Sequence, residues 1–190
     1  MLAEPAYVPP MPAGALLTAD ELLHVRIPNK RFELVKGVLL VREPPGGRHG
    51  RIALNVAVEL ASHVRAHDLG VVYAAETGFT LAHDPDTVRA PDVAFVRRER
   101  LPTPEPIGYP DLAPDLVVEV LSPGDRAGDL MARIADWLSA GARLVGVIDP
   151  DRRAARVYRH NGSEEILTAD QSFDGEDVVP GFSCRLGAVL

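Results

Sequence analysis

The strongest constraint on the fold is an apolar run at residues 116–121, LVVEVL, that contains one carboxylate. Every other residue of the run is Leu or Val, which predicts a strand buried in a sheet. Glu119 lies inside this run. A carboxylate removed from water costs several kcal/mol unless it is paired, metal-bound or protonated. The strand must therefore place Glu119 beside a partner.

The residues after this strand predict a turn, a helix and a second strand. The tetrapeptide SPGD at 122–125 is typical of a turn. Residues 129–141, DLMARIADWLSAG, carry apolar residues on one helical face, with Trp137 expected in the core and Gly141 as a stop. RLVGVIDP at 143–150 then predicts a strand.

The remaining segments predict elements on both sides of this unit. Helices are expected at 18–25, where Thr18 and Glu21 fit a capping box, and at 49–68. Strands are expected at 70–82 and 91–96, and hairpins at 31–43 and 154–168. Residues 97–114 are expected to form a long loop. This order predicts an α/β (α+β) fold with a central mixed β-sheet flanked by helices. Residues 1–15 are expected to form a flexible arm, and residues 16–190 a single domain.

Composition narrows the class of protein. The formal net charge of −7 argues against a general basic coat for nucleic acid, although it leaves room for a local basic surface. Cys184 is the only cysteine, so no disulfide within the chain is possible. The N-terminal residues lack the basic start of a secretory signal, and no run approaches the roughly 20 apolar residues of a membrane span. We therefore expect a cytoplasmic protein that does not enter membranes.

A second carboxylate is expected near Glu119. Asp92 opens the strand at 91–96, and the loop at 97–114 is long enough to return the chain antiparallel beside it. Two neighbouring carboxylates repel each other and raise each other's pKa unless a cation lies between them. A hard divalent ion, Mg²⁺ or Mn²⁺, suits such oxygen ligands. The alternative is a buried salt bridge to an arginine such as Arg133.

Several segments together resemble a known superfamily of nucleases. The ordered series PDVAF, PDLVVEVLSP and GDLMARIADWLSAGARLVGVIDP, with RFELVKGVLL and HGRIALNVAVEL before it and VPGFSCRLGAVL after it, is similar to the PD-(D/E)XK nucleases. Within them the chain resembles the Uma-two family of restriction-endonuclease-like proteins. The resemblance implies a restriction-endonuclease-like fold over residues 16–190. It also implies metal ligation by Asp92, Glu119 and the backbone carbonyl of Val120, and metal-assisted hydrolysis of DNA phosphodiester bonds.

The chain departs from the motif at its lysine. Leu121 stands where the motif has lysine, and Arg133 stands at the helix position that carries the lysine in the family it resembles. An arginine stays protonated, so it cannot act as a general base, but it can orient a phosphate or stabilise negative charge. We therefore expect activity that is weak or lost.

Other polar residues have two interpretations each. Glu33 matches the family's hairpin glutamate, which would reach the metal or a bound water; otherwise it is exposed or paired within the hairpin. His49 and Ser122 are candidate substrate contacts, or else a helix-end residue and a turn or capping residue. Glu76 is expected to face solvent from a strand, with the alternative that it lines the site, and Asp125 to complement a helix dipole, with the alternative that it binds metal.

An arginine cluster gives a further candidate surface. Arg97–Arg100, together with Arg89 and Arg126, would form a phosphate-facing patch or simply a solvated loop, since Glu99 interrupts it. Three functions remain open: a metal-dependent DNA endonuclease, a catalytically weakened binding or assembly module, and a metal-dependent hydrolase with another substrate. A homodimer is plausible, because cutting both strands of DNA takes two sites.

Overall fold

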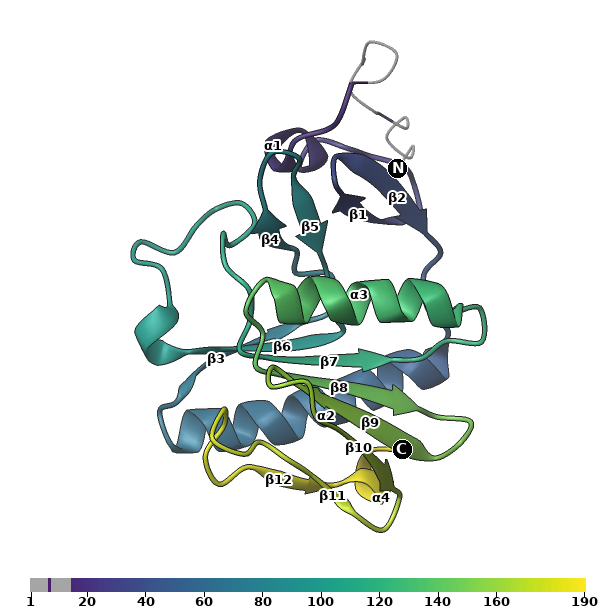
Figure 1. The fold of residues 1–190 in the computed structure, drawn as a ribbon, viewed down its shortest axis with the longest axis vertical. Helices are drawn as coiled ribbons and strands as arrows, with labels where there is room; N and C mark the ends of the chain where they lie inside the picture. Colours follow the sequence, from purple (N-terminus) through teal and green to yellow (C-terminus); the bar gives the residue numbers. More distant parts are fainter. Residues whose placement is uncertain (1–6, 8–14) are drawn as a thin grey trace, which may run out of the picture.

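The computed structural model describes residue 7 and residues 15–190. Its centre is a six-stranded sheet in the order β10-β9-β8-β7-β6-β3 (Figure 1). The strands are β3 (Gly70–Ala74), β6 (Val93–Arg97), β7 (Leu116–Val120), β8 (Leu144–Asp149), β9 (Ala154–Arg159) and β10 (Glu164–Thr168). β7 pairs with β8 in parallel and with β6 antiparallel, and the other pairs are antiparallel. The predicted mixed sheet is therefore confirmed.

Two helices cover the two faces of this sheet (Figure 1). Helix α2 (Gly47–Ala66) packs against the face that carries Val118 and Val120, through apolar residues that recur every four positions: Ile52, Val56, Leu60 and Val64. Helix α3 (Ala127–Ser139) buries Trp137 against the opposite face, which carries Val117. Because side chains alternate along a strand, Glu119 shares the face of Val117 and points toward α3.

A smaller four-stranded sheet, in the order β2-β1-β5-β4, lies across α3 from the central sheet (Figure 1). Its strands are β1 (Arg31–Val35), β2 (Val38–Arg42), β4 (Phe79–Ala82) and β5 (Thr87–Arg89). The β1–β2 hairpin turns at Lys36 and Gly37, whose φ angles are 50° and 75°. Both values lie in the left-handed region that tight hairpin turns require. The predicted hairpin is confirmed, and it forms one wall above α3.

The prediction of one strand at residues 70–82 is wrong. The chain forms β3 in the central sheet, turns at Glu76, and continues as β4 in the small sheet. Glu76 has a φ of 71°, which a strand cannot contain. It is exposed, as expected, but it lies in the turn between the two sheets, and it also lines the cavity described below. The residues Glu76, Thr77 and Gly78 interrupt the apolar character of this segment at the turn.

The ends of the chain add small elements. Helix α1 (Ala19–Leu22) begins at Thr18, and the capping box with Glu21 is present. The C-terminal segment forms β11 (Ser172–Asp174), β12 (Ser183–Arg185) and α4 (Leu186–Val189), which close the lower edge in Figure 1. A single turn of 3₁₀ helix, η1 (Arg98–Arg100), follows β6.

The predicted arm at residues 1–15 lies outside the described residues except for positions 7 and 15, and the single domain over residues 16–190 stays a prediction. Among the described helices, none combines the length and the apolar character needed to cross a membrane.

Candidate active site

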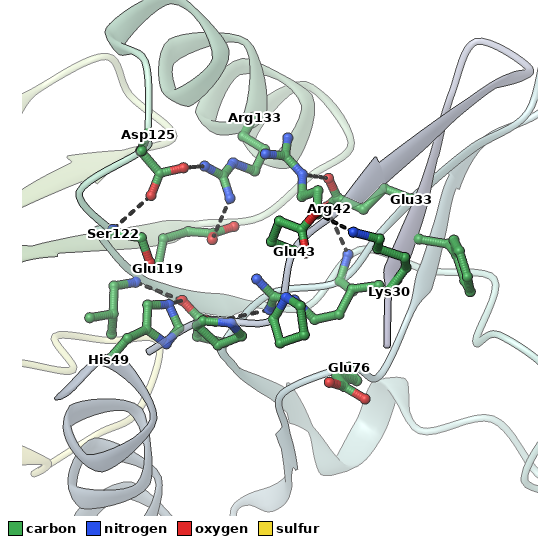
Figure 2. A pocket seen from close by; sticks show the side chains of 18 of the residues that line it. Lys30, Glu33, Arg42, Glu43, His49, Glu76, Glu119, Ser122, Asp125 and Arg133 are labelled. Atoms are coloured by element: carbon green, nitrogen blue, oxygen red, sulfur yellow. Dashed lines mark hydrogen bonds and ion pairs between the residues drawn. The ribbon is translucent and has the colours of Figure 1, made fainter. Parts of the chain in front are cut away.

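A cavity of about 650 Å³ opens between the β1–β2 hairpin, the start of α2, the end of β7 and helix α3 (Figure 2). Every site residue predicted from the sequence lines it. They are Glu33, His49, Asp92, Glu119, Val120, Ser122 and Arg133. These positions span 101 residues of sequence (133 minus 33, counted inclusively), so the fold brings together what the sequence separates.

Asp92 joins three elements at the floor of the cavity. It lies one residue before β6, and its Oδ2 accepts a hydrogen bond of 2.8 Å from the backbone N–H of Val120 at the end of β7. The Nε2 atom of His49, in the first turn of α2, lies 3.0 Å from the same oxygen. Arg31 approaches the other oxygen, Oδ1, only to 3.9 Å. Asp92 therefore lies beside the strand that carries Glu119, as the antiparallel pairing predicts.

Glu119 is 3% exposed and accepts hydrogen bonds from two residues of α3. Trp137 Nε1 donates to Oε1 at 2.9 Å, and Arg133 Nη1 donates to Oε2 at 3.3 Å. Burial raises the pKa of Glu119 to about 7; Arg133 and Trp137 oppose this rise, and Asp92 and Glu33 add to it. The salt bridge to Arg133 is present, but it does not offset the cost of burying the charge.

Arg133 is held between two acids (Figure 2). Its Nη2 donates to Asp125 Oδ1 at 3.0 Å, on the side away from Glu119. Burial disfavours the charged guanidinium, but Glu119, Glu33 and Asp125 outweigh burial and raise its pKa. Asp125 also accepts the backbone N–H of Ser122 at 2.8 Å, so it fixes the turn before α3. Asp125 thus contacts Arg133 directly, which the expected helix-dipole role did not include.

Glu33 is buried, at 4% exposed, and belongs to an ion-pair chain that runs from the hairpin to α3. Its Oε2 accepts from Arg42 Nε at 2.9 Å and from Arg89 Nη1 at 3.0 Å. Arg89 Nη2 then donates to Asp136 at 2.6 Å. The expectation of an exposed Glu33 is wrong, whereas pairing within the hairpin, through Arg42, is present. Sequence analysis missed Asp136 in this role.

The predicted arginine patch does not form. Arg89 is buried in the ion-pair chain, and Arg98 pairs with Asp68. Arg100 pairs with Asp115 at 2.8 Å, and Arg97 lies near the same carboxylate. The guanidinium groups of these arginines are therefore paired with acidic residues of the protein and do not form one phosphate-facing surface. Arg126 lies apart from them, at a second cavity of about 610 Å³ that shares Ser122 and His49 with the first.

The donor set suits a hard divalent ion, although it is small. The described residues contain no group of three or more His, Cys, Asp and Glu side chains placed to hold a metal. Asp92 and Glu119 supply two oxygen ligands, and Mg²⁺ usually completes its shell with waters. Within the described chain, Asp92 Oδ1 accepts no hydrogen bond, and burial raises the pKa of Glu119 even though Arg133 lies beside it, so a further cation at this site would favour the ionised carboxylate. The residues therefore fit a divalent ion in type and charge.

Comparisons with known proteins identify the family and support the fold. The model of the family Uma2, described as "Putative restriction endonuclease", matches residues 19–187. The chain belongs to this family. A crystal structure described as a "putative nuclease" from Anabaena variabilis matches with a TM-score of 0.80 over 91% of this chain and 97% of that one. At 22% identity it shows that the two chains share a fold. The search of curated proteins gave no match.

Proposed function

We propose that this protein is a divalent-metal-dependent endonuclease that acts on DNA. The observation that supports the proposal is the single cavity that Asp92, Glu119 and Arg133 all line, within a chain of this nuclease family. Asp92, Glu119 and the backbone carbonyl of Val120 are the proposed ligands of Mg²⁺ or Mn²⁺. The ion, when bound, activates water and neutralises charge on the phosphate.

The residues around the ligands have positioning roles in this proposal. His49 and the N–H of Val120 fix Asp92, and Trp137 fixes Glu119, so both carboxylates are held without a metal. Holding ligands in place before binding reduces the cost of ordering them. Arg133, which stays protonated, is the proposed phosphate contact from α3. Ser122 lines the cavity and is a proposed substrate contact.

Glu33 has a different proposed role from the one that the family resemblance implies. Arg42 and Arg89 both form ion pairs with the carboxylate of Glu33, and Arg89 also pairs with Asp136 of α3. These ion pairs link the β1–β2 hairpin to α3. Glu33 therefore supports the wall that faces Arg133, and it contributes negative charge to the cavity, which raises the pKa of Glu119.

A second candidate function is a binding or assembly module that has kept the fold and lost the chemistry. The ion pair between Arg133 and Glu119 favours it, because a guanidinium already stands beside one proposed metal ligand. The two candidates differ in metal affinity: the module binds Mn²⁺ poorly, whereas the nuclease binds it and cleaves. A homodimer stays a prediction under either function.

Nicking of supercoiled plasmid with Mg²⁺ or Mn²⁺ tests the nuclease. The wild type should nick, and Asp92→Ala should reduce nicking to background at equal protein concentration. Asp129→Asn is the matched control, since it removes an exposed carboxylate near the start of α3 that lies outside the cavity lining. Metal-dependent nicking that persists in Asp92→Ala would contradict the assignment, and folded wild type that neither binds Mn²⁺ nor nicks would favour the second candidate.

A further inference from the structure

Three buried side-chain nitrogen atoms in the described part of the chain have no hydrogen-bond partner: Arg31 Nε, His49 Nδ1 and Arg133 Nε. All three residues line the same 650 Å³ cavity. A buried polar group without a partner costs about 1–3 kcal/mol, so native structures rarely leave one. The concentration of such groups at one cavity, two of them on arginines, points to a ligand rich in hydrogen-bond acceptors.

Arg31 stands out among the arginines of this cavity. Its cross-strand partner Arg42 binds Glu33, and Arg133 binds Glu119 and Asp125. Arg31 contacts a carboxylate only at 3.9 Å, between Nη1 and Asp92 Oδ1, which is beyond hydrogen-bond reach. Its side chain is 26% exposed, so part of it remains accessible. Among the described residues, no acceptor takes up its donors.

We propose, resting on the nuclease function above, that Arg31 is a substrate-binding residue that contacts the DNA phosphate beside the metal ligands. Arg31 enters the cavity from the first residue of β1, and Arg133 enters it from α3. A phosphodiester has two unsubstituted oxygens, and a guanidinium matches phosphate geometry with a planar fork of donors. The two arginines therefore hold one phosphate between two walls of the cavity.

The position of Arg31 should have opposite effects on the binding of DNA and on the binding of the metal. Its charge lies 3.9 Å from a proposed metal ligand, so it opposes the binding of a divalent cation while it favours the binding of a phosphate. Removing the charge should weaken DNA binding and tighten Mn²⁺ binding. A merely structural arginine would not move these two affinities in opposite directions.

The test compares Arg31→Gln, Arg31→Lys and the control Arg156→Gln, which removes an equal charge at a residue outside the cavity lining. Affinity for a fluorescent DNA duplex is measured in Ca²⁺ over a range of salt concentrations, and Mn²⁺ affinity by calorimetry. Arg31→Gln should weaken duplex binding by about tenfold and reduce the slope of log K against log salt by about one. Arg31→Lys should keep the slope with an intermediate affinity, and Arg156→Gln should match the wild type.

The outcomes separate this inference from the function on which it rests. If Arg31→Gln binds the duplex with wild-type affinity and salt slope, the proposed role of Arg31 is overturned. The proposed nuclease function still stands in that case if the wild type nicks plasmid. A folded wild type that binds no duplex would overturn both proposals. If Arg31→Gln fails to fold, Arg31→Lys decides: reduced affinity at unchanged Mn²⁺ binding supports the inference, and unchanged affinity and turnover overturn it.

Discussion

Replacing Glu119 by glutamine should change how the stability of the metal-free protein depends on pH. Burial raises the pKa of this carboxyl to about 7 from its usual 4.5, so the folded state holds the proton more tightly than the unfolded chain does. The stability from this group is fully present below about pH 4.5 and is lost as the pH rises to about 7. Glutamine cannot titrate, so the variant lacks this loss.

The size of the effect follows from the shift. Between pH 5 and pH 7 the folded protein keeps the proton while the unfolded chain loses it, and each pH unit of this interval lowers the free energy of unfolding by about 1.4 kcal/mol. The free energy of unfolding of the wild type should therefore fall, relative to Glu119→Gln, by on the order of 2–3 kcal/mol between pH 5 and pH 8. Any fixed cost of the amide beside Arg133 and Trp137 is equal at both pH values and cancels.

Urea unfolding of both proteins at pH 5, 6, 7 and 8, with a chelator present, measures this difference. The two stability curves should diverge as the pH rises, in favour of the variant. Parallel curves would refute the reasoning, because they would mean that Glu119 is ionised in the folded protein across this range. Added Mn²⁺ at pH 8 should stabilise the wild type and not the variant, since only a ligand that binds the folded state raises stability.

Three further substitutions give expected outcomes. Trp137→Phe removes the N–H donor to Glu119 and should cost about 1–3 kcal/mol of stability in urea, more at pH 8 than at pH 5, because the ionised acid needs the donor more; an equal loss at both pH values would contradict this. Arg89→Met removes a buried partner from Glu33, which keeps Arg42, and from the partly exposed Asp136, and should cost about 1–3 kcal/mol by the same measurement, whereas the exposed pair broken by Arg156→Met should cost under about 1 kcal/mol. Arg133→Lys restores the residue type of the family motif and should increase plasmid nicking, and a decrease would show that the planar guanidinium is itself required.

The sequence was sufficient to predict the centre of the fold and the pair of acids. The apolar run around Glu119 and the strand after Asp92 are each buried and short, and the loop between them is long enough for an antiparallel return. Burial of a carboxylate within such a run is itself a signal of a site, because the fold must offset its cost.

The ion pairs that link the walls of the cavity were beyond prediction. Arg89 lies 47 residues from Asp136 and 56 from Glu33, and no local pattern indicates which of the chain's acids an arginine will meet. The short strands β4 and β5 exist because they pair with each other and with the β1–β2 hairpin, so their own residues carry little signal. Arg31 was missed for the same reason. It stands out only because, among the described residues, the fold places no hydrogen-bond acceptor within reach of its side chain, and the sequence does not show this.

The most direct test of the account is calorimetric titration of the wild type, Asp92→Asn and Glu119→Gln with Mn²⁺ at pH 8, with Asp129→Asn as a control. The central claim is that Asp92 and Glu119 jointly hold one divalent ion. It predicts one site in the wild type and the control, and loss of that site in each of the two cavity variants. Absence of binding in the folded wild type, or equal binding in all four proteins, would contradict it and leave the two carboxylates with a structural role.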